Sequence, residues 1–151
     1  MAVRVRVQQA VFDLAAEIAE LTGGRTDVGG VASFCGLCRA DDGLVTLELE
    51  HYPGMTERAI ERIADEAARR WPLTGATVIH RVGAIPPGAP IVLVLTASSH
   101  RAAALESCAF LIDWLKTRAP FWKREVFADG STRWVEAKGE DDQAAARWDR
   151  A

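Results

Sequence analysis

The strongest constraint on the fold is a run of five residues, Ile91-Val92-Leu93-Val94-Leu95, in which every side chain is apolar. Successive residues of a β-strand point to opposite faces of the sheet, so such a run can be buried only when both faces are covered. We therefore expect a strand over residues 91–97 at the centre of a sheet. The rest of the chain must supply the layers that cover it.

Other segments alternate apolar and polar side chains, as strands with one buried face do. This pattern predicts further strands at residues 3–7, 31–38, 45–51 and 77–82. Two more strands are expected within Phe121 to Ala137. They are joined at Asp129-Gly130, a dipeptide that tolerates the positive φ angles of a tight hairpin.

Three helices are predicted from apolar side chains spaced three or four residues apart. The first has Asp13 as its N-cap and ends at Gly23-Gly24, and the second has Thr56 as its N-cap and ends at Trp71-Pro72. The third covers about residues 100–118, with Ser98 or Ser99 as its N-cap and a buried stripe of Leu105, Cys108, Ile112 and Leu115. Hairpins combined with three helices predict an α+β fold rather than a strict βαβ series.

The size of the chain favours a single domain over residues 1–151, with a core at about 3–137 and a polar, acidic tail over 138–151. A net charge of −3 excludes a general basic surface for nucleic acid or an anionic membrane. No segment approaches the roughly 20 apolar residues of a membrane span. The N-terminus also lacks the apolar stretch of a secretory signal, so the expected location is the cytoplasm.

A candidate anion site lies at His100-Arg101, where the central strand passes into the third helix. Free backbone N–H groups, the helix dipole and the Arg101 guanidinium could converge there on a phosphate. Such junctions are frequent, however. Taken alone, the pair is therefore better explained by a solvated Arg101 beside an ordinary, partly buried His100.

A second candidate site lies at the end of the third helix, where four cations surround Pro120, Phe121 and Trp122: Lys116, Arg118, Lys123 and Arg124. A solvated basic face at the negative end of the helix dipole is the structural explanation. The chemical alternative is that crowded cations lower the proton affinity of Lys116 until it can act as a nucleophile or acid/base. The neighbouring aromatic rings offer a flat surface for a heterocycle.

The segment Cys35-Gly36-Leu37-Cys38 has the C-x-x-C spacing of redox dithiols and of half a zinc site. Residues three apart in a regular strand point to opposite faces, so the thiols diverge unless Gly36 marks a bulge. No second C-x-x-C or histidine pair completes a tetrahedral zinc site. Structural cysteines are therefore favoured, with a small thiol oxidoreductase as the alternative.

Four blocks of sequence carry a resemblance to a known family, and they occur in order within about residues 30–137. They read Leu49-Glu50-His51-Tyr52-Pro53-Gly54-Met55-Thr56, Val78-Ile79-His80-Arg81-Val82-Gly83, Ser99-His100-Arg101 and Leu115-Lys116-Thr117-Arg118-Ala119-Pro120-Phe121-Trp122-Lys123-Arg124-Glu125. Together they resemble the large, catalytic subunit of molybdopterin synthase. The resemblance implies an α/β hammerhead-like domain with a mixed or antiparallel sheet, three helices and a C-terminal β-hairpin.

The resemblance also implies a sulfurtransferase of molybdenum cofactor synthesis that uses no metal or other cofactor of its own. Two large subunits would form a homodimer, and each would bind the Gly-Gly tail of a small ubiquitin-like subunit, giving a heterotetramer. The thiocarboxylate at the end of that tail would donate sulfur to cyclic pyranopterin monophosphate. Two transfers build the dithiolene, and part of each pocket comes from the neighbouring large subunit.

By position, Lys116 and Lys123 resemble the two active-site lysines of the family. The residues that resemble its substrate pocket are Arg39, His100, Arg101, Phe34 and Lys138. Lys138 stands where the resemblance implies an arginine, which keeps the charge but loses the planar fork.

The implied roles follow from the chemistry of these side chains. Arg39 and Arg101 would bind the cyclic phosphate in bidentate fashion. Lys116 would act as acid/base or transient nucleophile toward the thiocarboxylate carbonyl, while Lys123 would hold charge or substrate. A non-catalytic adaptor that keeps the fold and binds the ubiquitin-like partner is the alternative, and the presence of both lysines argues against it.

Overall fold

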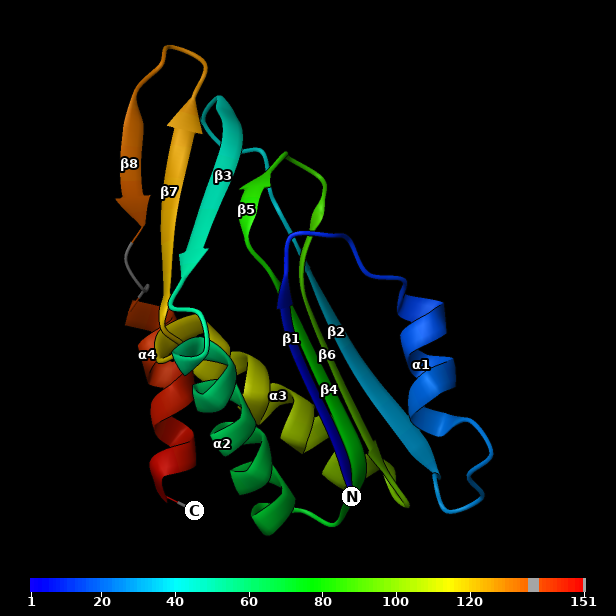
Figure 1. Cartoon of the computed structure of the whole chain (residues 1–151). Coiled ribbons are helices and arrows are strands. Elements are labelled where there is room, and N and C mark those ends of the chain that lie inside the picture. Colours follow the sequence, from blue (N-terminus) through cyan, green and yellow to red (C-terminus); the bar gives the residue numbers. More distant parts are fainter. Residues whose placement is uncertain (136–138, 151) are drawn as a thin grey trace.

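The computed structural model describes residues 1–135 and 139–150, and within them the strands form two four-stranded sheets (Figure 1). Sheet A has the order β1-β4-β6-β2, where the strands are β1 (Ala2–Gln8), β4 (Leu73–Arg81), β6 (Pro90–Ser98) and β2 (Gly30–Leu37). The β1–β4 pair is parallel, and the β4–β6 and β6–β2 pairs are antiparallel. The sheet is therefore mixed, as predicted.

Sheet B is antiparallel and has the order β5-β3-β7-β8. Its strands are β5 (Gly83–Ile85), β3 (Leu44–His51), β7 (Phe121–Phe127) and β8 (Thr132–Val135). The β7–β8 hairpin projects away from the helices at one end of the molecule (Figure 1). Its turn contains Gly130 at a φ of 84°, as predicted for the Asp129-Gly130 hairpin.

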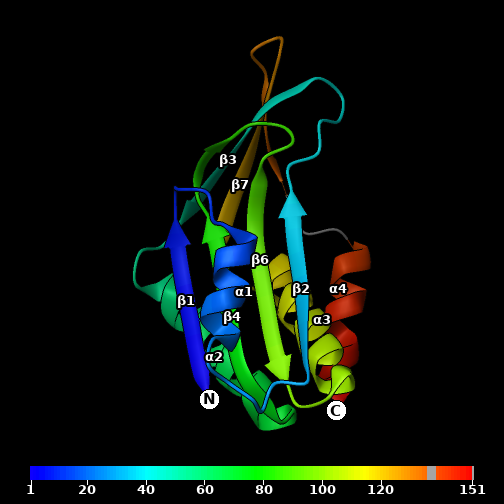
Figure 2. The same cartoon turned by 90° about the vertical axis from the view of Figure 1, so that its right-hand side faces the viewer.

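Helices cover both faces of sheet A, with α1 in front of it and α2 and α3 behind it in Figure 2. The helices of the described part are α1 (Leu14–Thr22), α2 (Met55–Arg70), α3 (Arg101–Thr117) and α4 (Gly139–Ala146), and a 3₁₀ turn, η1, follows over Arg147–Arg150. No helix in the described ranges is both long and apolar enough to cross a membrane.

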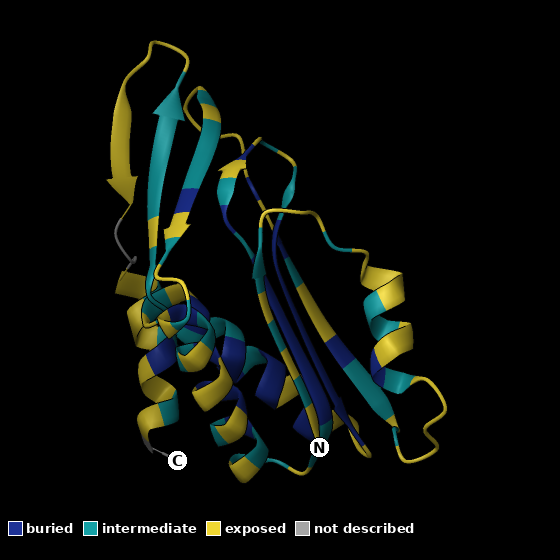
Figure 3. Cartoon of the chain, viewed as in Figure 1, coloured by how far each residue is buried: buried dark blue, intermediate teal, exposed yellow. Residues whose placement is uncertain are grey.

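The central position predicted for the apolar run is confirmed. Strand β6 lies between β4 and β2, and its side chains alternate between two clusters of buried residues. Val92 and Val94 pack with residues of α2 and α3, whereas Leu93 and Leu95 pack with Leu21 of α1. Figure 3 shows the resulting buried layer through sheet A and the exposed strand β8.

The predicted α+β class is confirmed, but the helix count is higher than the three expected. Helix α4 forms in the segment predicted as a polar tail, and Trp148 in the following turn packs edge-on against Trp71 at 5.6 Å and Phe110 at 5.7 Å. A single tryptophan in a charged segment gives no helical periodicity, so the sequence pattern missed this docking. The short strand β5 was likewise missed, because three residues are too few to establish alternation.

Two predicted N-caps are wrong, because their hydroxyl groups bind elsewhere. Helix α2 begins after Gly54, whose N–H donates to the Glu57 carboxylate at 3.2 Å. The Thr56 hydroxyl instead accepts a hydrogen bond from the Tyr52 N–H at 2.9 Å and donates to the Pro120 carbonyl at 3.1 Å.

At α3 the N-cap residue is His100, while the Ser98 and Ser99 hydroxyls donate to the Pro72 and Asp27 carbonyls. One residue of the predicted α3 stripe is also misplaced. Leu105 is 61% exposed, and Ala104 and Leu111 complete the buried face beside Cys108.

Candidate active site

The two lysines predicted to be catalytic lie on different elements that meet at one cavity. Lys116 is in the last turn of α3, Lys123 is in β7, and both line a cavity of about 350 Å³. Arg39, which follows β2, lines the same cavity. This volume falls within the range of small-molecule sites, so the fold brings together three cationic residues from distant parts of the chain at a site of useful size.

The alternation of strand β7 decides which of its side chains face this cavity. Lys123 lies opposite Leu49 of β3 and Val135 of β8. Glu125, two residues further on, points to the same face and also lines the cavity. Arg124 points to the other face, where its Nε donates to the Glu48 carboxylate at 2.9 Å.

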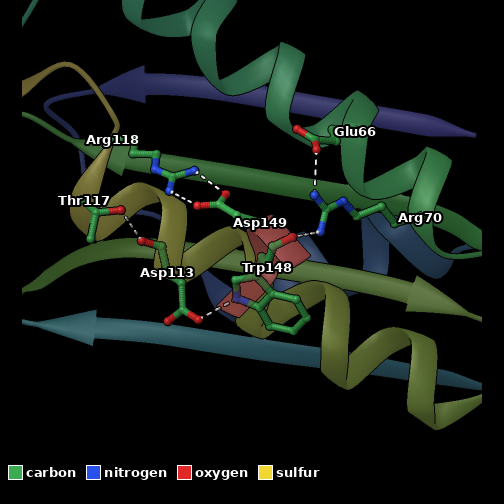
Figure 4. A network of polar contacts seen from close by, with 7 residues as sticks. All are labelled: Glu66, Arg70, Asp113, Thr117, Arg118, Trp148 and Asp149. Atoms are coloured by element: carbon green, nitrogen blue, oxygen red, sulfur yellow. Dashed lines mark hydrogen bonds and ion pairs between the residues drawn. The ribbon is translucent and has the colours of Figure 1, made fainter. Parts of the chain in front are cut away.

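The four cations of the Lys116–Arg124 segment therefore separate into two pairs. Both arginines bind carboxylates outside the cavity, and Arg118 donates two hydrogen bonds, of 3.1 and 2.9 Å, to Asp149 in the turn after α4 (Figure 4). Within residues 1–135 and 139–150, no carboxylate forms an ion pair with Lys116 or Lys123. The two lysines thus line the cavity without a direct ion pair to any described carboxylate.

The pKa of Lys123 is lowered from 10.5 to about 8. The largest cause is burial, which disfavours the ammonium form, and the positive charge of Lys116 adds to it, while Asp141 of α4 opposes it. From the sequence, this effect of crowded cations was expected at Lys116, but the structure supports it for Lys123. A lysine with such a pKa has a neutral amine in an appreciable fraction of molecules near pH 7.

Glu125 and Arg133 are two of the pocket residues that were not predicted from the sequence. The Glu125 carboxylate accepts a hydrogen bond from Arg133 of β8 at 2.9 Å, and both side chains line the cavity. The alternation that assigned Lys123 to a strand could have identified Glu125, because residues two apart share a face. Arg39 pairs with Asp41 at 2.7 Å and is 76% exposed at its side chain, so it can reorient toward an anion.

His100 and Arg101 do not reach this cavity within one chain. They are exposed residues at the first turn of α3, roughly 22 Å from Lys116 along the helix axis at about 1.5 Å per residue. No described side chain caps the N-terminus of α3. The helix start that was expected to bind an anion therefore lies at the far end of α3 from the two lysines.

Phe34 lies on strand β2, between these two regions, and is 38% exposed. Its ring edge is close to Gly36, where an added Cβ would stand 3.3 Å from the ring. Lys138, which was also expected to bind substrate, lies outside the described residues.

The C-x-x-C cysteines pack on different sides of sheet A. Cys35 contacts the cluster beneath α1, whereas Cys38 belongs to the cluster beneath α2 and α3 and is 3% exposed. The strand register shifts between Gly36 and Leu37, but this irregularity does not bring the thiols together. Burial raises the pKa of both thiols, which makes them poor nucleophiles. Across the described ranges, no group of three metal-ligating side chains is placed to hold a metal ion.

Comparison with known proteins decides the family. A model of the family described as MoaE protein matches residues 7–118 of this chain. The chain belongs to the MoaE family. A MoaE-family relative from Mesorhizobium japonicum, named molybdopterin synthase catalytic subunit, is 63% identical over 150 residues, which are 98% of this chain and 94% of the relative.

Solved structures of MoaE proteins have the same fold. The molybdopterin biosynthesis MoaE protein from Burkholderia ambifaria MC40-6 matches with a TM-score of 0.84 and 50% identity over 99% of each chain. Molybdopterin synthase from Staphylococcus aureus matches with a TM-score of 0.78 and 27% identity, over 85% of this chain and 94% of that one. The predicted α+β class and family resemblance are therefore confirmed.

Proposed function

We propose that this chain is the catalytic subunit of a molybdopterin synthase, a sulfurtransferase of molybdenum cofactor synthesis. It takes sulfur from the thiocarboxylated C-terminus of a small ubiquitin-like subunit and adds it to cyclic pyranopterin monophosphate. The observation that carries this proposal is the convergence of Lys116, Lys123 and Arg39 on one cavity in a MoaE-family chain. The names of the relatives agree with it.

The charges of the cavity suit the proposed chemistry. The thiocarboxylate sulfur attacks a substrate carbon that carries the cyclic phosphate, the carbon–oxygen bond to the phosphate breaks, and the opened phosphate is the leaving group. The small subunit and the substrate are then joined through a thioester. Water then adds to the thioester carbonyl, the carbon–sulfur bond to the small subunit breaks, and the sulfur stays on the substrate. Cationic side chains stabilise the oxyanion formed when water adds, and a neutral amine accepts the proton of the water.

The low pKa of Lys123 favours a division of these tasks that differs from the one implied by the resemblance. Lys123, with a pKa of about 8, is suited to act as the base, because about one molecule in ten carries a neutral amine at pH 7. Lys116 is exposed at the rim of the same cavity and supplies positive charge to the carbonyl oxygen. Arg39, whose ion-pair partner within the described residues is the exposed Asp41, can bind the substrate phosphate.

A second copy of the chain completes the site in this proposal. His100 and Arg101 are exposed but too far along α3 to reach the cavity of their own chain. In a homodimer they would enter the cavity of the neighbouring subunit, with Phe34 near the boundary. Together with two small subunits, the homodimer forms a heterotetramer. We place the reaction in the cytoplasm, and cell fractionation tests this location.

Reconstitution tests the proposed activity. The chain is mixed with thiocarboxylated small subunit and cyclic pyranopterin monophosphate, and dithiolene product is measured. Lys116→Ala and Lys123→Ala should each lose most of the turnover, whereas Arg118→Ala, which changes a cation that faces Asp149, is the matched control. A stable complex that yields no product would establish the adaptor alternative instead.

Mixed dimers test the shared pocket. Lys123→Ala and Arg101→Ala subunits are each inactive as homodimers in this proposal. When the two variants are co-expressed in equal amounts, half of the dimers contain one of each, and one of their two pockets is intact. About a quarter of the wild-type activity should return. If the two residues act within one chain, mixing restores no activity.

A further inference from the structure

His80 is a buried titratable residue that the proposed reaction does not use. It lies near the end of β4 and is 4% exposed. Its Nδ1 is 2.8 Å from the Arg81 carbonyl oxygen. A carbonyl oxygen only accepts hydrogen bonds, so the proton of the ring is on Nδ1, and the hydrogen bond fixes the orientation of the imidazole.

The His80 ring connects the two sheets. It stacks on the ring of Phe121 with a centroid distance of 3.8 Å and an angle of 21° between the planes. His80 belongs to sheet A and Phe121 begins β7 of sheet B, and these two strands do not pair. Phe121 and Lys123 are two residues apart in β7, so their side chains share the face that lines the pocket.

Three basic side chains lie near enough to the His80 ring for their charges to act on it. They are Lys123 of β7, Lys116 of α3 and His51 of β3, and each contributes to lowering the pKa of His80, although burial is the larger cause. The pKa falls to about 3, so the ring is neutral at every pH at which the lysines could react. A neutral ring adds no further positive charge near Lys123.

We propose that His80 is a positioning residue for Lys123. Its ring, held by the Arg81 carbonyl and stacked on Phe121, presses the first residues of β7 against sheet A and excludes water from the inner side of Lys123. This inference rests on the proposed function only for the chemical role of Lys123. The low pKa of Lys123 agrees with it, because burial is the largest cause of that shift.

Competitive chemical labelling of lysines measures the pKa of Lys123 without any substrate. In the wild type, the labelling of Lys123 should follow a pKa of about 8. His80→Ala removes the ring and admits water, and we expect the pKa to rise by about one unit or more toward the ordinary value. His80→Phe is the matched variant, because it keeps a flat ring against Phe121, and the pKa should stay within about 0.3 units of the wild type.

Two results would overturn the proposal. An unchanged Lys123 pKa in folded His80→Ala would mean that the ring does not shield the lysine. An equal rise in His80→Ala and His80→Phe would mean that the ring stack is not the cause. If His80→Ala does not fold, Phe121→Leu removes the same stack from the other side and must raise the pKa in the same way.

The outcome is independent of the proposed function. If Lys123→Ala is fully active, Lys123 is not the base of the reaction, but the labelling still reports whether His80 shields it. If Lys123→Ala is inactive and the pKa of Lys123 does not depend on the residue at position 80, the proposed function stands and only the proposed role of His80 is wrong. In active enzyme, the ascending limb of the kcat/KM pH profile should move with the labelled pKa in His80→Ala, while KM changes little.

Discussion

The Thr56 hydroxyl donates a hydrogen bond of 3.1 Å to the carbonyl oxygen of Pro120, across 64 positions in the sequence. Thr56 lies in the first turn of α2 and is fully buried, and Pro120 lies in the short segment between Lys116 and Lys123. This contact holds the segment on which the relative placement of the two lysines depends. A residue with no place in the pocket thereby contributes to its geometry.

Replacing Thr56 with valine keeps the side-chain volume but removes the hydroxyl. The Pro120 carbonyl loses its donor and the Tyr52 N–H loses its acceptor, so the free energy of unfolding should fall by about 1–3 kcal/mol. Turnover should fall as well, because the lysines are less well positioned. Urea unfolding and steady-state kinetics measure both effects. Thr56→Ser, which restores the hydroxyl, should recover most of each loss.

Lys123→Met should make the protein more stable at pH 7 while abolishing turnover. The pKa of Lys123 is about 8 in the folded state against 10.5 in the unfolded state, so the folded chain binds fewer protons between these values and its stability rises with pH. Below pH 8 the buried charge destabilises the wild type by about 1–3 kcal/mol. Urea titrations at pH 7 and pH 10 should show the difference between variant and wild type shrinking at high pH.

Trp148→Ala should release the C-terminal segment. The indole packs against Trp71 and Phe110, and its Nε1 donates to Asp113 at 2.8 Å. Because Trp148 is only partly buried, we expect a loss of about 2–3 kcal/mol rather than the larger cost of a fully buried tryptophan. Limited proteolysis should then cleave between α3 and the C-terminus at low protease concentrations. Equal protease resistance of variant and wild type would show that the segment docks without this side chain.

Joint replacement of Cys35 and Cys38 by alanine should leave at least about half of the activity. The two thiols pack on different sides of sheet A, and burial raises their pKa and so suppresses their ionisation. The stability cost at buried Cys38 should be about 1 kcal/mol. A double variant that folds but has no activity would revive the thiol oxidoreductase hypothesis. Activity assays before and after alkylation of the wild type provide an independent measurement.

The sequence by itself determined those features that depend on neighbouring residues. The run of residues 91–95 is central because side chains alternate along any strand, Asp13 caps α1 through a hydrogen bond to the Ala16 N–H, and Asp129-Gly130 turns the C-terminal hairpin. The family resemblance is likewise a property of the sequence, because it is carried by short motifs in a fixed order. It named Lys116 and Lys123 as active-site lysines.

Only the tertiary structure decided which of the four cations near residue 120 share a cavity and which bind carboxylates elsewhere. Arg118 forms an ion pair with Asp149, and Arg124 forms one with Glu48. Both partners are distant in sequence. The low pKa of Lys123 and the stack between His80 and Phe121 also arise from contacts between distant parts of the chain. A pKa depends on which groups the folded chain brings within a few ångströms of one another. The spacing of residues along the sequence does not reveal those distances.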